Sequence, residues 1–161
     1  MTDDLFLEQL SEMREMIYRV SSAQLERACD RDDAVQEAMF KAWHNRHKLR
    51  DERYMKTWVI RILINECHNI HRRRHREVIT DSLPESPVIS ENNLGLYEAL
   101  HKLDRKLRIP VILHYIEGYS TQEISKILKL PKGTVLWRMS KARKELAQLL
   151  DTETGEQRDD I

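Results

Sequence analysis

Cysteine and histidine side chains recur at four-residue intervals in one basic segment of the chain. Cys67, His71 and His75 would share one face of a helix, where thiolate and imidazole groups could hold zinc and activate water. Three ligands along one helix cannot complete a tetrahedral site, so His44 or His47 would have to contribute. A buried thiol on an apolar face is ordinary, and no carboxylate and histidine constellation suggests catalysis. We therefore expect no catalytic residue, no metal and no cofactor.

The same segment carries side chains suited to nucleic acid. In a helix over 55–74, the side opposite the apolar stripe holds residues that can contact phosphates and base edges, namely Arg61, Asn65, His68 and Arg72, with Trp58 at its border. The preceding stretch "HNRHKLRDERYMK" combines basic groups with Tyr54, which suits unstacked single-stranded bases.

A second basic helix follows a short connection. Gly118 fits the left-handed position that ends one helix, and Ser120 with Glu123 forms a capping box that starts the next. After the tight turn "LPKG", Thr134 could cap a further helix. Two helices joined in this way predict a helix-turn-helix, although any helical hairpin has a similar pattern.

The stretch "GTVLWRM" at the start of this last helix is unusual for a DNA-binding surface. A helical wheel puts Val135 and Met139 in a core stripe that continues through Ala142 and Leu146. It puts Trp137 nearly opposite, among lysines, and it puts Leu136 at the edge of the core. An outward tryptophan indicates contact with DNA or with a docked protein.

The segment "DRDDAVQEAMFKAW" predicts a different kind of surface. Its apolar stripe leaves an outward face with acidic and amide groups around one aromatic ring, comprising Asp33, Gln36, Glu37, Phe40 and Lys41. An acidic face is poorly suited to DNA, so we expect a protein-docking surface with Phe40 as its anchor. An ordinary solvated face is the alternative.

These surfaces need helices to position them, and the composition favours an all-α chain. The 161 residues are 40% hydrophobic and 34% charged, with only 4 glycines and 4 prolines. Apolar spacing predicts helices over 4–20, 23–29, 32–45, 55–74, 96–103, 105–117, 120–129 and 134–150. They form two small helical domains, 1–77 and 96–150, joined by an acidic flexible linker over 78–95 and followed by an acidic tail over 151–161.

A net charge of zero conceals alternating blocks. Residues 41–77 and 102–150 each carry 11 basic and 4 acidic groups, so each is +7, whereas 78–101 carries 4 acidic groups and no basic one. Local basic clusters govern phosphate affinity, and acidic blocks can mask them, so we expect weak DNA binding by the chain alone. With two cysteines, no signal peptide and no membrane-length apolar run, we expect a cytoplasmic chain that does not insert into membranes.

Together these segments resemble the extracytoplasmic-function (ECF) sigma factors of bacterial RNA polymerase, within the sigma-70 family. "DDAVQEAMFKAW" is similar to region 2.2 of that family, "MKTWVIRILINECHNIHRRRHR" to regions 2.3 and 2.4, and "LHKLDRKLRIPVILHYIEGYSTQEISKILKLPKGTVLWRMSKARKEL" to region 4. The chain departs at Asp104, a helix N-cap where a proline is usual, and at Leu136-Trp137, where many members have Lys-Ser.

The resemblance implies a role in transcription initiation, with core RNA polymerase and promoter DNA as partners. Residues 1–77 would be region 2, whose docking face would bind the β′ clamp helices through Asp33, Gln36, Glu37, Phe40 and Lys41. Its surface for the −10 element would melt DNA through Arg53, Tyr54, Lys56, Trp58, Arg61, Asn65, His68 and Arg72. Region 4, residues 96–150, would read the −35 element through Lys132, Thr134, Trp137, Arg138 and Lys141, with Ile109 to Ile116 on the β flap. The linker would thread the polymerase channel.

The resemblance also implies a chain that is monomeric when free, and family members are commonly held by an anti-sigma factor that wedges between the two domains. A stand-alone helix-turn-helix regulator is the main alternative, although the sequence shows no dimerisation helix. A metal-dependent nucleic-acid enzyme built on the cysteine and histidine cluster is the third hypothesis.

Overall fold

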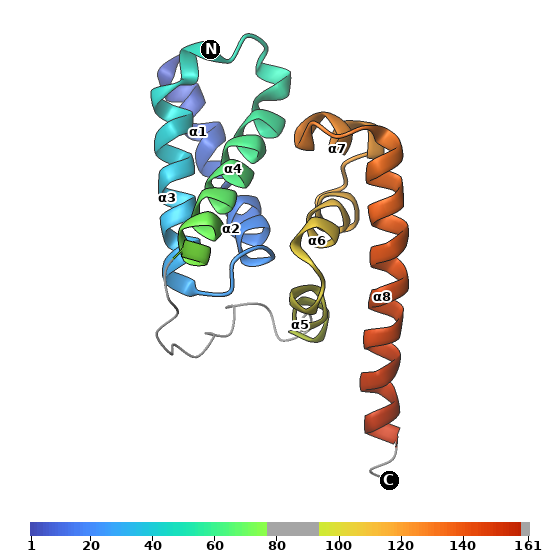
Figure 1. Ribbon diagram of the computed structural model, residues 1–161. Helices are drawn as coiled ribbons and strands as arrows, with labels where there is room; N and C mark the ends of the chain where they lie inside the picture. The colour runs from blue at the N-terminus through green and yellow to red at the C-terminus, as the bar shows by residue number, and fades with distance from the viewer. Residues whose placement is uncertain (77–93, 159–161) are drawn as a thin grey trace. The chain divides into compact units, whose positions relative to one another are not determined.

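The computed structural model describes the backbone of residues 1–76 and 94–158, and the side chains of 1–76 and 95–151. The chain divides into two compact units, Met1–Pro87 and Val88–Ile161. Every regular element in the described ranges is helical, as the sequence predicted (Figure 1). Residues 78–93 of the expected linker lie outside the described residues.

The first unit is built from α1 (Asp3–Glu12), α2 (Arg14–Ser22), α3 (Ala28–His44) and α4 (Met55–Arg76). Short 3-10 turns, η1 (Arg46–Lys48) and η2 (Glu52–Tyr54), lie between α3 and α4. The long helices α3 and α4 pack against each other, with α2 against both (Figure 1). Their shared core is fully buried and includes Ile17, Leu25, Ala38, Val59, Ile60, Leu63 and Cys67.

The N-terminal helices differ from the prediction. The single helix expected over 4–20 is broken at Met13, whose N–H is shared between the carbonyls of Gln9 and Leu10 as one helix ends and the next begins. The helix expected over 23–29 is wrong, because α2 ends at Ser22 and a turn leads directly into α3. The buried guanidinium of Arg31 donates to the carbonyls of Leu25 and Glu26, so a residue from α3 satisfies the turn's acceptors.

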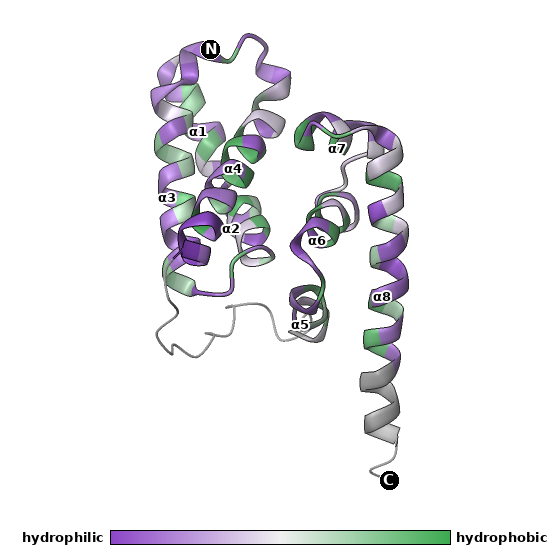
Figure 2. Cartoon of the chain, in the orientation of Figure 1, coloured by the Kyte–Doolittle hydropathy of each residue, from purple (hydrophilic) through white to green (hydrophobic). Residues whose placement is uncertain are grey.

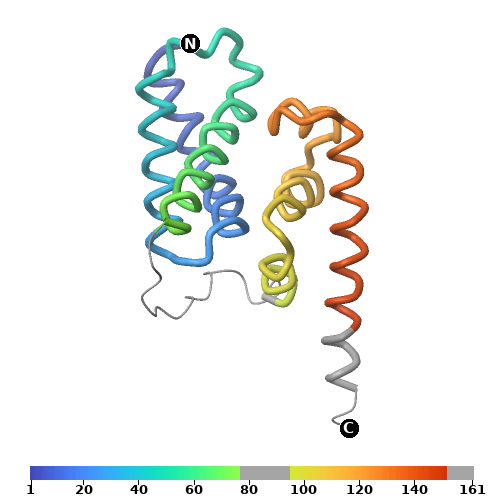
Figure 3. The backbone as a smooth tube through the Cα atoms, in the orientation of Figure 1, coloured from blue at the N-terminus to red at the C-terminus, as the bar shows by residue number. Residues whose placement is uncertain are grey.

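The second unit contains α5 (Leu94–Lys102), α6 (Arg105–Val111), α7 (Thr121–Leu128) and α8 (Lys132–Arg158). Its core includes Leu100, Ile112, Leu113, Ile124, Val135, Met139 and Ala142. The helix α5 takes in the last two residues of the expected linker, and α8 continues past the expected end at residue 150 into the acidic tail (Figure 1). Figure 3 traces the backbone through α6, α7 and the first part of α8. None of the described helices combines the length and apolar character that crossing a membrane requires.

The helix expected over 105–117 changes its geometry part of the way along. After α6 the chain forms a wider π-helical turn, η4 (Ile112–Ile116), in which the N–H of Glu117 bonds to the carbonyl of Ile112 at 3.1 Å. Pro110 lies inside α6, and proline brings no N–H to a helix. Asp104 caps α6 as predicted, accepting from the N–H of Lys106.

The connections around α7 follow the predicted chemistry at one end only. Gly118 has a φ of +78°, and Ser120 and Glu123 form the reciprocal capping box, both as predicted. At the other end the left-handed residue is Lys129, and α8 begins at Lys132. The prediction that Thr134 caps α8 is wrong, since its N–H already donates to the carbonyl of Pro131 within the first turn.

Candidate nucleic-acid and protein interfaces

The outward face of α3 is arranged as predicted. Asp33, Gln36 and Glu37 are exposed, and 60% of Phe40 is accessible to solvent. The Phe40 ring stacks on the His44 imidazole one helical turn away, with centroids 5.8 Å apart. The stacking orders the aromatic side chain while leaving its other face open, a state suited to an anchor for a protein partner.

Lys41, the fifth member of this face, also has a structural role. It is only half-exposed and pairs with Glu66 of α4, while its Nζ lies 3.9 Å from Glu37 Oε1. Glu66 is 7% exposed, a buried carboxylate that the sequence reasoning missed. The sequence feature that could have predicted this burial is an acidic residue at a position of α4 that faces the core. The ion pair ties the acidic face of α3 to the helix that carries the basic stripe.

That stripe runs along α4. Lys56, Asn65 and Arg72 are exposed, whereas Arg61 and His68 are partly covered. The Arg72 guanidinium donates to the side-chain oxygen of Asn69. The described end of α4 is basic, with Arg73, Arg74 and Arg76 beside it. The arrangement puts basic side chains suited to phosphates beside polar groups of the kind that contact base edges.

Trp58 belongs more to the core than to this stripe. It is half-buried and meets the buried ring of Phe6 edge to face, at a centroid distance of 6.4 Å. Phe6 also contacts Trp43 at 6.1 Å. The guanidinium of Arg46 lies 3.8 Å above the Trp43 ring, so the aromatic cluster is covered by a cation.

The segment between α3 and α4 presents Arg53 and Tyr54 to solvent. Tyr54 is 60% exposed, and Arg53 pairs with Asp51 at 2.8 Å. Hydrogen bonds from the Arg53 side chain and backbone lower the pKa of Asp51 below its ordinary value. The loop thus offers an open aromatic ring with an ordered cation beside it, the combination that base stacking uses.

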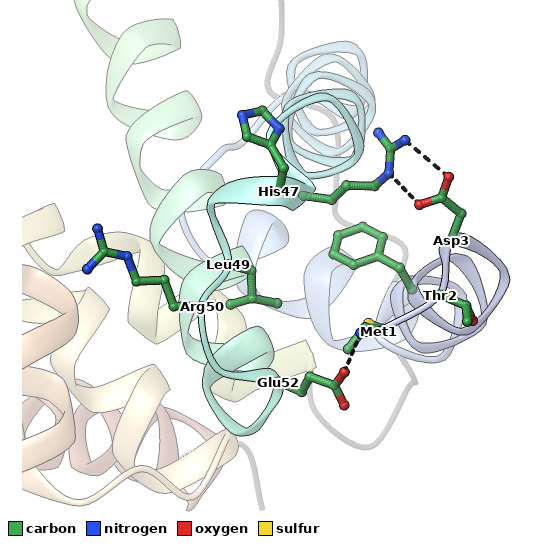
Figure 4. A pocket seen from close by; sticks show the side chains of 9 residues that line it. Met1, Thr2, Asp3, His47, Leu49, Arg50 and Glu52 are labelled. Atoms are coloured by element: carbon green, nitrogen blue, oxygen red, sulfur yellow. Dashed lines mark hydrogen bonds and ion pairs between the residues drawn. The ribbon is translucent and has the colours of Figure 1, made fainter.

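A pocket of about 420 Å³ opens where this segment meets the start of α1 (Figure 4). Asp3 holds Arg46 through two hydrogen bonds of 2.8 and 3.2 Å, which lower the pKa of the Asp3 carboxyl. The rest of the lining is Met1, Thr2, Phe6, His47, Leu49, Arg50 and Glu52. The sequence pointed to His47 as a possible metal ligand and to the stretch from His44 to Lys56 as a basic segment for nucleic acid. It did not predict this pocket, because the pocket forms between segments forty or more positions apart in sequence.

The cysteine and histidine cluster does not form a metal site in the described residues. Cys67 is fully buried, and the Nε2 atom of His71 lies 2.8 Å from the carbonyl oxygen of Gln24. No group of three potential ligands comes together among the described side chains. In the described residues the thiol therefore serves packing, and the imidazole lies at hydrogen-bond distance from a backbone carbonyl.

The basic face of α8 agrees with the wheel at Trp137, which is 61% exposed. Lys132 and Lys141 are exposed, Thr134 and Arg138 are partly covered, and the Lys141 ammonium lies 5.2 Å from the Trp137 ring centroid. The prediction for Leu136 is wrong, since this side chain is 47% exposed and does not belong to the edge of the core. Figure 2 shows apolar and polar residues alternating along α8.

The flap-binding segment expected over Ile109 to Ile116 is largely interior. Ile109, Val111, Ile112 and Leu113 are buried within the second unit, so they are not available as a docking surface in this state. Tyr115 is the exposed large side chain in this segment, at 56%, and its hydroxyl accepts from Arg143 of α8.

Two family models match the chain in the order that this geometry suggests. Residues 10–77 match sigma-70 region 2, and residues 94–146 match sigma-70 region 4. The candidate residues for the acidic face and the basic stripe fall in the first match, and those of α8 fall in the second.

Curated relatives agree with these matches. The ECF RNA polymerase sigma factor SigM of Mycobacterium tuberculosis is 30% identical over 126 residues, which cover 75% of this chain and 64% of SigM, less than two thirds of its length. The ECF RNA polymerase sigma factor SigW of Bacillus subtilis is 27% identical over 91% of this chain and 89% of SigW.

A solved structure agrees in fold. The sigma factor RpoE, solved with the anti-sigma factor NepR from Bartonella quintana, superposes with a TM-score of 0.78 at 23% identity, covering 91% of this chain and 96% of RpoE. With both conserved regions present in order, the chain belongs to the ECF sigma factors of the sigma-70 family.

Proposed function

We propose that the chain binds core RNA polymerase and directs it to promoters, where it supports melting of the −10 element and initiation of transcription. The observation that carries the proposal is the pairing, on one chain, of regions 2 and 4 with exposed side chains suited to both kinds of partner. The chemistry of RNA synthesis would belong to the polymerase, and the chain itself would be a non-enzymatic initiation factor.

The acidic face of α3 would dock on the clamp helices of the polymerase β′ subunit. Phe40 would supply the apolar anchor, and Asp33, Gln36 and Glu37 would supply polar contacts around it. Lys41 would act less as a direct contact than as the residue that fixes α3 against α4 through Glu66.

The −10 element would be held by the loop that precedes α4 together with the stripe on that helix. Tyr54 is open for stacking with an unpaired base, with Arg53 next to it. Lys56, Asn65 and Arg72 are exposed for the DNA backbone and base edges, with Arg61 and His68 behind them. Trp58 would support this surface from beneath through its contact with Phe6.

The −35 element would be read as duplex by the start of α8. Lys132 and Lys141 are exposed and would contact phosphates, and the exposed Trp137 lies beside Lys141. Thr134 and Arg138, both partly covered, would contribute at the margins. In this proposal residues 1–77 act as region 2, 96–150 as region 4, 78–95 as the connection through the polymerase and 151–161 as an acidic tail.

A regulator is the further partner that we propose, from the family resemblance. An anti-sigma factor that covers the acidic face of α3 would compete directly with core polymerase. The proposal places the chain in the bacterial cytoplasm with its polymerase, as a monomer until it is bound.

Run-off transcription with purified core polymerase tests the proposed function. We expect promoter-dependent transcripts only when the chain is added, tight binding to core and weak binding to duplex DNA alone. A stand-alone regulator, which no observation here favours, would instead bind duplex DNA without polymerase. Absence of both core binding and a promoter-dependent transcript would refute the proposal.

A further inference from the structure

Two large apolar side chains that are consecutive in sequence are both exposed to solvent on α8. Leu136 is 47% exposed and Trp137 is 61% exposed, while Val135 and Met139 on the opposite side are fully buried. The core of the second unit therefore uses neither side chain of the pair. Adjacent exposed apolar groups of this size usually mark a binding surface.

The surroundings of the pair are basic. Lys132, Lys141 and Lys144 are exposed around it, and the Lys141 ammonium is 5.2 Å from the Trp137 ring centroid. A cation at this distance from an indole is attracted to the face of the ring, so Lys141 and Trp137 form a cation–π pair. Three ammonium groups around an apolar centre complement a polyanion that offers an apolar patch between its charges.

A glycine lies on the same side of the helix. Gly133 has no left-handed φ, and a Cβ built on it would meet nothing within 4 Å, so neither backbone geometry nor packing requires glycine there. Four residues separate Gly133 from Trp137, which puts the two about one turn apart on neighbouring parts of the surface. A missing side chain at this place lets a ligand approach the backbone closely.

We propose that Leu136 and Trp137 read the 5-methyl groups of thymines in the major groove of the −35 duplex. The inference rests on the proposed function and names what its second surface recognises. In the major groove the thymine methyl is the large apolar group that base edges present, whereas an apolar side chain would leave the donors and acceptors of the other edges unpaired. An apolar pair with lysines around it therefore selects thymine. The lysines contact the flanking phosphates, and the backbone at Gly133 lies close to the DNA.

Replacing thymine with deoxyuridine tests this reading, because the exchange removes one methyl and leaves Watson–Crick pairing intact. Holoenzyme first selects its −35 sequence from a library randomised there, and each thymine of the selected duplex is then exchanged in turn. Burial of one methyl is worth roughly 0.8 kcal/mol, so we expect about a four-fold loss of holoenzyme affinity at one or two positions. A duplex in which cytosine replaces such a thymine should bind holoenzyme more weakly, and 5-methylcytosine at that position should recover part of the holoenzyme affinity.

Variants assign the effect to the pair. Holoenzyme with Trp137→Ala, or with Leu136→Lys and Trp137→Ser together, should bind thymine and deoxyuridine duplexes equally well. Lys144→Ala is the matched control. It should weaken holoenzyme binding to both duplexes alike and reduce the salt dependence of that binding, while the difference between the thymine and deoxyuridine duplexes should remain. The melting temperature of Trp137→Ala should stay close to that of the parent chain, since the side chain contributes little to the core.

Three results would overturn the inference. One is a selection that shows no preference for thymine in the −35 sequence. Another is a selected site in which no exchange of thymine for deoxyuridine changes holoenzyme affinity. A Trp137→Ala chain that loses core binding but keeps its DNA preference would show that the face docks protein. A holoenzyme that makes no promoter-dependent transcript at all would instead refute the proposed function itself, which separates the two failures.

Discussion

The faces of α3 and α8 each expose one large aromatic side chain, but they differ in the charge around it and in how they are held. Phe40 stands among Asp33 and Glu37, whereas Trp137 stands among lysines. The α3 face is tied to α4 by Lys41 and Glu66, while the α8 face belongs to one helix whose opposite side is buried. Under the proposed function, an exposed aromatic ring would meet a protein partner in one unit and DNA in the other, and the charge around the ring would make the difference.

The largest effect that would test this comparison is on polymerase binding. Phe40→Ala should weaken binding to core polymerase by about 2–4 kcal/mol, because an aromatic anchor at the centre of an interface carries much of its energy. A binding titration with labelled chain measures it. The matched exchange Trp137→Ala should leave core affinity nearly unchanged. Equal losses for both variants, or none for Phe40→Ala and Glu37→Ala, would contradict the assignment of the docking face.

A smaller effect separates the roles of Lys41. Lys41→Met should lower the free energy of unfolding by about 1–2 kcal/mol, because it leaves the buried carboxylate of Glu66 without the cation that pairs with it. The loss should stay modest because Lys41 is partly exposed, so the pair is only partly desolvated. Adding Glu66→Leu to the same chain should recover much of that loss. Chemical denaturation of the four chains in the cycle provides the measurement. A loss that the second exchange does not relieve would show that the ion pair is incidental.

The contrast in charge predicts a difference in salt dependence. Arg72→Ala should reduce the slope of log affinity for promoter DNA against log salt by about 1, the change expected for one phosphate contact. Phe40→Ala should leave that slope unaltered. Holoenzyme binding to a promoter fragment across a salt series gives both values. An unchanged slope for Arg72→Ala would remove this residue from the DNA surface.

The difference between the two faces also explains what the sequence could predict. Trp137, Met139 and Phe40 were placed correctly because a helical wheel needs only the period of one helix. The wheel failed at Leu136, because an edge position is buried only if another element covers it. The turn before α3, the pairing of Glu66 with Lys41 and the pocket at Arg46 depend on contacts between distant segments, which periodicity does not encode.

The smallest expected effect concerns the contact between Asp3 and Arg46. It tests whether a contact between residues far apart in sequence stabilises the first unit. Hydrogen bonds from Arg46 lower the pKa of Asp3, so the carboxylate stabilises the fold above its ordinary pKa of about 4, and that contribution disappears as the pH falls through the lower folded value. Asp3→Asn should therefore lower the melting temperature slightly at pH 7, and the difference from the parent chain should vanish once the pH has fallen below the lowered pKa of Asp3. Asp51→Asn is the control: its pKa is lowered too, but by Arg53 two residues away, in a pair that the unfolded chain can also form. Its effect should be smaller at every pH. If the two variants behaved alike, the contact between Asp3 and Arg46 would stabilise the fold no more than a local ion pair does. Of the two long-range contacts tested, only the pair of Lys41 and Glu66 would then distinguish the surface of the first unit, which several segments build, from the surface of α8, which one helix builds.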